Sequence, residues 1–267
     1  MIARADAALP ATKLRRWWWL AVISFVISLI ALAPAALLER AISPDSQVRF
    51  AADGGTIWNG RGRISVLTDT TPQTVQVVWK FEPTALLRLR LGFHVTADGP
   101  MIAGTSRVGL RTGSIELRAS VITADAHALS AAHRLAAVFA PQGKLRLQQS
   151  DGESLTIDFP GNADGAWRVD GNMGLHAEQF VLGGFVNAAV GSHEIAIQGT
   201  GTTVNFSIPR SSGALKLEGA GSLTLASPRR FTFSGFATAA SDAPASLKQL
   251  GAALPDGRQR LELNSPW

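Results

Sequence analysis

The chain has 267 residues, of which 46% are hydrophobic and 17% charged, so it can bury a core and wholesale disorder is excluded. It has no cysteine, which excludes disulfide scaffolds, thiolate metal sites and cysteine nucleophiles. The formal charge is +5, but residues 1–40 hold five basic and two acidic side chains, which leaves only +2 for residues 41–267. No nucleic-acid-binding surface is therefore expected.

An uncharged run of 22 residues extends from Trp17 to Leu38, directly after a cluster of basic residues. As a helix it would be about 33 Å long, enough to cross the ~30 Å hydrocarbon core of a bilayer. The positive-inside rule then places residues 1–16 in the cytoplasm as a basic tail and residues 41–267 in the periplasm. The sequence therefore predicts a single retained transmembrane helix over 17–38 in the inner membrane.

A cleaved signal peptide is the main alternative to this anchor, because Ala33-Pro34-Ala35 resembles a small-x-small cleavage site. The apolar run continues past that site through Leu37 and Leu38, and three tryptophans open it, which favours the anchor. A buried core helix is a third interpretation, which the length of the uncharged run disfavours. Both the anchor and the signal peptide would export the rest of the chain.

Short runs in which apolar and polar residues alternate recur along residues 41–267, separated by Gly, Pro, Asn and Asp. Strands are expected over Thr74–Glu82, Leu87–Thr96 and Ser114–Ile122, and shorter runs bring the total to about a dozen. One polar and one apolar face indicate an antiparallel sheet that is covered on one side. The predicted fold is mainly β: an N-terminal membrane helix followed by a twisted, antiparallel β-sheet domain.

The first two of these strands are expected to lie side by side, with Pro83–Leu86 as their connection. Their apolar stripes would then form one continuous surface, which we expect to be a structural core. The two stripes consist of Val75, Val77, Trp79 and Phe81, and of Leu87, Leu89, Leu91 and Phe93.

Two short helices are expected, over Ala126–Ala140 and Ala245–Leu254. Each ends at a Pro-x-Gly turn followed by an x-Leu-x-Leu strand, and about 115 residues separate them. This weak repeat suggests two β-rich halves, 41–150 and 151–267. Coincidence between two common turn patterns is the alternative explanation.

Motifs that carry chemistry are missing from the sequence. The five histidines form no His-Glu-x-x-His pair, there is no Gly-x-Ser-x-Gly elbow, and no carboxylate run resembles a calcium loop. The glycine pairs are not followed by a helix or by Lys-Ser/Thr, so they do not indicate a phosphate-binding loop. No catalytic residue, metal or cofactor is predicted, and an enzyme is not expected.

The segment GGTIWNGRG at residues 54–62 resembles the Gly-x-hydrophobic-Trp-x-Gly signature of the type II secretion system protein N family, also called general secretion pathway protein N. The following strand with its Trp-Pro-Leu-Leu order resembles that family's next segment, and the layout of tail, span and sheet is similar over the whole chain. The residues that carry the resemblance, all expected to be structural, are Gly55, Trp58, Gly60, Trp79 and Pro83.

The resemblance implies an accessory inner-membrane subunit of the machinery that exports folded proteins across the outer membrane. Such a subunit would be a non-catalytic scaffold, with the inner membrane and other subunits of the machinery as its partners. The alternative is a membrane-anchored periplasmic lipid-binding or lipid-transfer protein, whose curved apolar sheet face carries acyl chains. Neither interpretation implies a nucleic acid or a small-molecule substrate.

Overall fold

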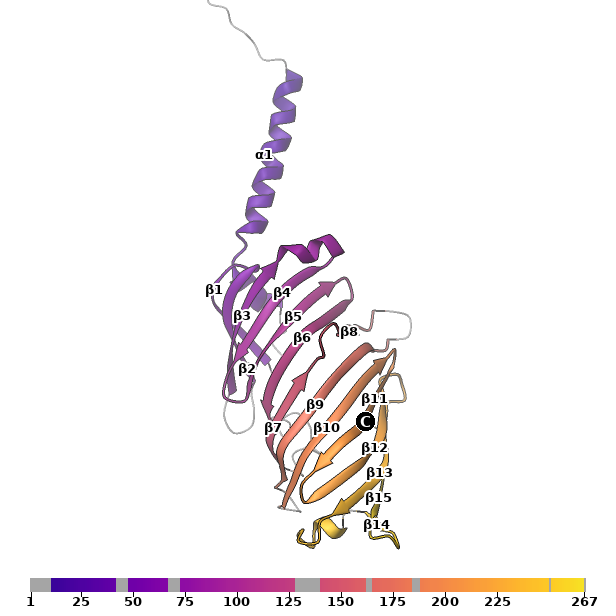
Figure 1. Cartoon of the computed structure of the whole chain (residues 1–267). Coiled ribbons are helices and arrows are strands. Elements are labelled where there is room, and N and C mark those ends of the chain that lie inside the picture. Colours follow the sequence, from indigo (N-terminus) through magenta and orange to yellow (C-terminus); the bar gives the residue numbers. More distant parts are fainter. Residues whose placement is uncertain are drawn as a thin grey trace, which may run out of the picture.

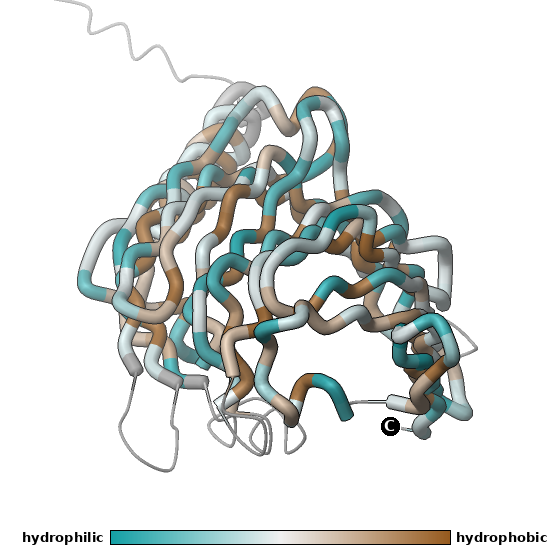
Figure 2. The backbone as a smooth tube through the Cα atoms, turned by 60° about the horizontal axis from the view of Figure 1, so that its bottom comes forward, coloured by the Kyte–Doolittle hydropathy of each residue, from teal (hydrophilic) through white to brown (hydrophobic). Residues whose placement is uncertain are grey.

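The computed structural model describes residues 11–41, 48–66, 73–127, 140–161, 165–183, 188–249 and 251–266. One helix, α1 (Ala11–Ala31), projects from the end of a long, twisted antiparallel sheet (Figure 1). Viewed along its length, the sheet is bent into an arch (Figure 2).

The helix α1 is shorter at its C-terminal end than the sequence predicts. It stops at Ala31, and residues Ala35–Ala41 form a 3-10 helix, η1, so the prediction of one continuous helix over 17–38 is wrong at that end. Pro34 lies between the two helices, and a proline has no N–H to continue the helical hydrogen bonds. Among the described residues, no helix combines the length and the hydrophobicity that crossing a membrane requires.

The sheet confirms the mainly antiparallel β fold. Within the described residues it contains 15 strands, and every neighbouring pair is antiparallel. The strands are β1 (Val48–Gly55), β2 (Asn59–Val66), β3 (Gln73–Glu82), β4 (Leu91–Asp98), β5 (Ile102–Arg111), β6 (Ser114–Asp125), β7 (Pro141–Gln148), β8 (Ser154–Asp158), β9 (Arg168–Leu182), β10 (Ala188–Thr200), β11 (Thr203–Ser212), β12 (Leu215–Thr224), β13 (Arg230–Ala239), β14 (Ala252–Ala253) and β15 (Gln259–Pro266).

Most strands pair with their sequence neighbours, so the sheet grows as a meander. The exception is at its middle, where β7 and β8 lie end to end between the longer strands β6 and β9 and pair with both. Shifts of register interrupt several pairs, including β5 with β6 and β9 with β10. Such bulges increase the twist of a sheet, which accounts for the arch in Figure 2. Pairing continues across residue 150, and the division into halves 41–150 and 151–267 stays a prediction.

The predicted strand Thr74–Glu82 is confirmed as β3, and Ser114–Ile122 lies within β6. The predicted strand Leu87–Thr96 is wrong at its start, because a 3-10 helix, η2 (Pro83–Arg88), comes first and β4 begins at Leu91. Leu89 ends η2 in the left-handed conformation, with a φ of 53°. Leucine and arginine therefore alternate through η2 and its cap, although that segment is a helical turn and not a strand.

The two predicted helices have different outcomes. Most of Ala126–Ala140 lies outside the described residues. The prediction of a helix over Ala245–Leu254 is wrong, since that segment forms a 3-10 turn, η3 (Leu247–Gln249), and the short strand β14. Leu247 is fully buried, and the Gln259 side-chain amide donates to its carbonyl oxygen at 3.1 Å, so packing against the sheet decides the conformation.

The apolar face of the sheet holds separate buried clusters near its two ends. At the end near α1, Val75, Val77 and Trp79 of β3 are covered by Ala35 of η1. At the other end, Leu247 of η3 closes a cluster that includes Ala188, Val190, Leu215 and Ala237. The first stripe is thus a core, as predicted, whereas Leu87 and Leu89 are 88% and 91% exposed and do not belong to it.

Replacing Trp79 by alanine should lower the free energy of unfolding by about 3–5 kcal/mol, because the side chain is only 7% exposed and its loss leaves a large cavity. The control is Val78→Ala, whose side chain lies on the opposite face of β3 and is half exposed, and it should cost less than about 1 kcal/mol. Urea unfolding of the full chain in detergent measures both. Equal losses in the two variants would show that this stripe is not a core.

Candidate functional site

The described residues contain no group of three His, Asp or Glu side chains that could hold a metal ion. The features that could instead serve binding are the junction between α1 and the sheet, a pocket lined by arginines, and an apolar cavity. Each of them is built by residues from several strands.

The junction depends on two glycines in the turn between β1 and β2. A Cβ on Gly55, whose φ is +90°, would lie 2.4 Å from the carbonyl oxygen of Asn59. Gly60 lies directly opposite Trp79 in the pairing of β2 with β3, and a Cβ there would lie 2.4 Å from the indole ring. Glycine at these two positions therefore lets the turn close and lets the Trp79 ring lie over the neighbouring strand.

Two indole groups fasten this turn to its surroundings. Trp58 Nε1 donates to the carbonyl oxygen of Ile30, near the C-terminus of α1, at 2.8 Å. Trp79 Nε1 donates to the carbonyl oxygen of Ile57 at 3.1 Å. The Trp58 ring also packs against Phe81, with ring centroids 5.0 Å apart. The Ile30 carbonyl also accepts from the backbone N–H of Ala33 at 3.2 Å, so Trp58 adds a second hydrogen bond to it from the sheet.

All five residues of the sequence resemblance lie in one region of the fold. Gly55, Trp58, Gly60 and Trp79 build the junction, and Pro83 starts η2 at the end of β3. Their structural role remains a prediction. No sequence pattern connects Trp58 with α1, because the donor and acceptor are 28 residues apart.

The helix η2 lies over the polar face of the sheet, and a glycine makes room for it. A Cβ on Gly92 would lie 2.4 Å from the Cβ of Ala85, the residue of η2 that is buried against the sheet. Gly92 pairs with Gly109 of β5, which in turn pairs with Glu116 of β6. The two glycines of this row leave a depression beside η2 on a face where longer side chains would otherwise stand.

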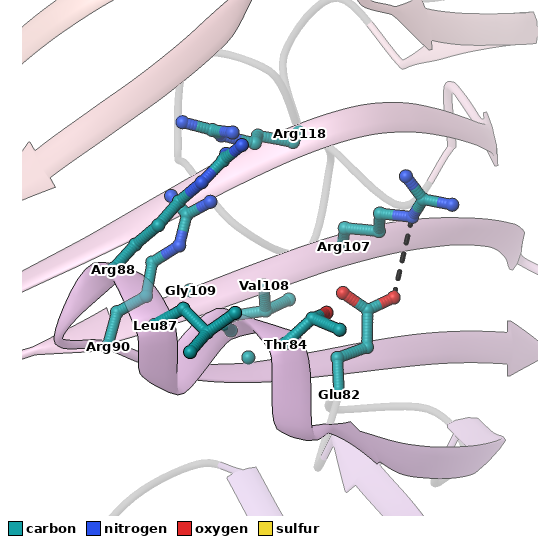
Figure 3. A pocket seen from close by; sticks show the side chains of 11 residues that line it. Glu82, Thr84, Leu87, Arg88, Arg90, Arg107, Val108, Gly109 and Arg118 are labelled. Atoms are coloured by element: carbon teal, nitrogen blue, oxygen red, sulfur yellow. Dashed lines mark ion pairs between the residues drawn. The ribbon is translucent and has the colours of Figure 1, made fainter.

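Arginine side chains line the depression, which has a volume of about 320 Å³ (Figure 3). Arg88 and Arg90 reach it from η2 and the start of β4, Arg107 from β5 and Arg118 from β6. Arg88, Arg90 and Arg118 converge at one end, while Arg107 lies at the other, 3.4 Å from the carboxylate of Glu82. We refer to these four arginines as the arginine pocket.

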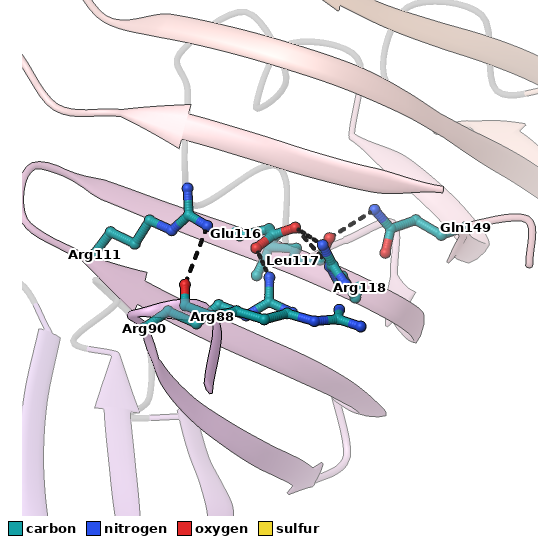
Figure 4. Close-up of polar contacts among 7 residues, drawn as sticks. All are labelled: Arg88, Arg90, Arg111, Glu116, Leu117, Arg118 and Gln149. Carbon is teal, nitrogen blue, oxygen red and sulfur yellow. Dashed lines mark hydrogen bonds and ion pairs between the residues drawn. The ribbon is translucent and has the colours of Figure 1, made fainter. Parts of the chain in front are cut away.

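Glu116 holds two members of the arginine pocket in place. Its carboxylate forms ion pairs with Arg90 and Arg118 (Figure 4). Burial opposes ionisation of Glu116, but the hydrogen bonds from Arg118 and Arg90 outweigh it, so the pKa of this carboxyl lies below its ordinary value. Two carboxylates, Glu82 and Glu116, face four guanidinium groups, which leaves the pocket with a net charge of +2.

The sequence could not show the arginine pocket, because its members occupy positions typical of a solvated strand face. Alternation placed Arg88 and Arg90 on one strand with their side chains in water. The signal that could have indicated otherwise is Pro83, which favours the start of a helical turn, followed by Gly92 at the point where the turn rests on the sheet.

The apolar cavity has a volume of about 700 Å³ and lies on the apolar face, toward the C-terminal strands. His193 of β10 contributes to its wall and is only 6% exposed. The Nδ1 atom of His193 lies 2.8 Å from the Ser211 hydroxyl, whereas Nε2 has no partner among the described residues. The walls include Leu145, Leu175, Phe180, Val190, Ile195 and Leu217.

A comparison with protein families identifies the chain. The model of type II secretion system (T2SS), protein N, matches residues 46–262, which is well over half of the chain. The chain belongs to the type II secretion system protein N family. The match covers the arginine pocket, the sheet side of the junction and nearly all of the apolar cavity, whereas α1 lies outside it. No curated protein and no solved structure matches the chain.

The free energy of unfolding should decrease as the pH is lowered, because of His193. Burial lowers the pKa of this histidine in the folded state, so below its ordinary value of about 6.5 the unfolded chain binds a proton that the folded chain does not. The stabilisation present above that value should be lost at up to about 1.4 kcal/mol per pH unit until the folded-state pKa is reached.

Urea unfolding at pH values between about 7.5 and 5.5 tests this, with a His193→Asn variant that cannot titrate. The matched control is His94→Asn, which replaces an exposed histidine and should keep the pH dependence of the parent. An unchanged pH dependence in His193→Asn would show that this histidine is not responsible.

Proposed function

We propose that this chain is an accessory, non-catalytic subunit of the type II secretion system, anchored in the inner membrane, which supports the export of folded proteins across the outer membrane. Membership of the protein N family carries this proposal, since it associates the chain with the secretion machinery. A type II secretion role and contact with other subunits of that machinery follow from the family. The anchoring in the inner membrane, the scaffold role and the absence of catalysis are parts of the proposal that go beyond family membership.

The membrane anchor in this proposal is α1. Apolar side chains on it are exposed from Trp17 onward, including Phe25 and Leu29, and such a surface favours a lipid environment over water. Lys13, Arg15 and Arg16 precede this apolar part in the sequence, and basic residues flanking an apolar helix favour its cytoplasmic end. The proposed topology has residues 1–16 in the cytoplasm and residues 41–267 in the periplasm, with a single pass between them.

The scaffold role rests on the architecture that α1 and the sheet form together. The indole of Trp58 ties α1 to β1 and β2, so the first strands have a fixed position relative to the helix. The sheet extends far from that point (Figure 1), and its edges and polar loops offer surfaces for other subunits. These surfaces would hold partners at a set distance from the anchor.

A second candidate function is the binding or transfer of lipid. The observation that favours it is the apolar cavity of about 700 Å³, whose walls are mainly aliphatic. A cavity of this size and lining suits an acyl chain, and the arched sheet would then act as a groove for lipid. In this function the proposed anchor would be retained and the partner would be a phospholipid.

Cross-linking in cells tests the proposed function. The tagged full chain should stay with the membranes during an alkaline wash. After extraction with detergent, it should be captured together with known subunits of the type II machinery. The matched control carries α1 and its basic tail on an unrelated exported domain, and it should capture none of them.

The two candidates differ in what accompanies the chain. Capture of phospholipid in a fixed ratio to the protein, without any secretion subunit, would contradict the scaffold role and favour lipid binding. Recovery of the chain as a soluble periplasmic product would contradict the anchor and indicate a cleaved signal.

A further inference from the structure

The structure points to a second contact with the membrane beside the proposed anchor. Leu87 and Leu89, at the end of η2, are 88% and 91% exposed, although leucine side chains favour burial. Both flank Arg88, and the backbone carbonyl of Arg88 accepts a hydrogen bond from Arg111 at 3.5 Å. Segments that lie in a membrane surface combine leucines, which enter the acyl boundary, with basic side chains toward the headgroups.

The helix η2 lies at the same end of the sheet as α1 (Figure 1). The connection between them is short: Trp58 donates to Ile30 near the end of α1, and the amide of Phe81 donates to the carbonyl of Trp58 at 2.8 Å. Phe81 is two residues before Pro83, where η2 begins. A membrane that contains α1 would therefore have its surface close to η2.

The arginine pocket lies directly beside these leucines. The guanidinium of Arg88 forms no ion pair with any described residue, whereas Arg90 and Arg118 share Glu116. Arginine groups that converge around an open depression with a net charge of +2 suit a phosphate ester, which offers several oxygens for their N–H donors. The neighbouring leucines suit the acyl chains of the same molecule.

We propose that η2 and the arginine pocket bind anionic phospholipid at the periplasmic surface of the inner membrane, with the lipid phosphate among Arg88, Arg90 and Arg118 and the side chains of Leu87 and Leu89 in the acyl region. This contact would fix the tilt of the sheet relative to the membrane, which one helix alone does not. The proposal rests on the proposed anchoring of α1.

The absence of native cysteine allows a direct test with the full chain. A Leu87→Cys variant carries an environment-sensitive fluorophore and is reconstituted in phosphatidylcholine vesicles, with or without phosphatidylglycerol. Phosphatidylglycerol should shift the emission to the blue as the probe enters the acyl region, and added salt should reduce the shift. The control label at Glu218→Cys, exposed on β12 at the far part of the sheet, should not respond.

Charge variants test the role of the arginine pocket. Replacing Arg88 by glutamine should lower the ratio of membrane-buried to exposed probe about fivefold, because one basic side chain near an anionic surface contributes about 1 kcal/mol. Arg210→Gln removes an exposed arginine of β11 and should leave the ratio unchanged.

The outcomes separate this proposal from the anchor. Failure of the chain to float with pure phosphatidylcholine vesicles would contradict the anchoring of α1. Flotation without any response of the Leu87 probe to phosphatidylglycerol would overturn the present proposal alone. A blue shift in detergent that grows with protein concentration would show that the leucines contact a second copy of the chain. A response of the probe to inorganic phosphate as large as its response to phosphatidylglycerol would assign the pocket to free phosphate. Either result would overturn it.

Discussion

The hydrogen bond between the Trp58 indole and the carbonyl of Ile30 fixes the position of α1 on the sheet. It depends on a turn that closes only because Gly55 and Gly60 leave room for their neighbours. In the same turn, the carbonyl of Ile57 accepts a hydrogen bond from the Trp79 indole. The Trp79 ring belongs to the core cluster of β3. The position of the helix and the packing of the first strands are therefore set by one small group of residues.

The alternation of apolar and polar residues has a consequence for the whole chain, because it gives a very long sheet one apolar face that water must not reach. Different elements cover the apolar face at different positions along the sheet. Near α1, η1 covers the face with Ala35, and at the far end η3 covers it with Leu247. The apolar cavity adjoins the far-end cluster, with which it shares Val190 and Leu215, and the buried His193 forms part of its wall. The scaffold role needs only the covered ends, whereas lipid binding would need the cavity.

The sequence was a good guide where one local pattern decided the structure. The alternating residues of β3 predicted that strand nearly to its ends, and Gly, Pro and Asn between the runs predicted the turns. It was a poor guide where contacts distant in sequence decided. Pro34 ended the hydrophobic helix, and the next residues packed on β1 and β2, which a count of uncharged residues does not reveal.

The same distinction explains the remaining differences. Leucine and arginine alternate through η2 as they would in a strand, but Pro83 and the contact of Ala85 with Gly92 impose a helical turn. Alanine-rich composition suggested a helix near Leu247, yet burial of that side chain against β13 gave a turn and a short strand. The arginine pocket joins three strands and a turn, so its assembly required the pairing of β4, β5 and β6.

Hydrogen exchange of the full chain tests most directly whether Trp58 fastens α1 to the sheet. A Trp58→Phe variant keeps an aromatic ring against Phe81 but removes the N–H that reaches Ile30. We expect faster exchange of the Ile57 amide, which donates to Ala33, with no change in β12 and β13. The control, Trp167→Phe, alters a partly exposed tryptophan that packs on Phe159 and should leave Ile57 protected. Unchanged protection of Ile57 in Trp58→Phe would contradict the account.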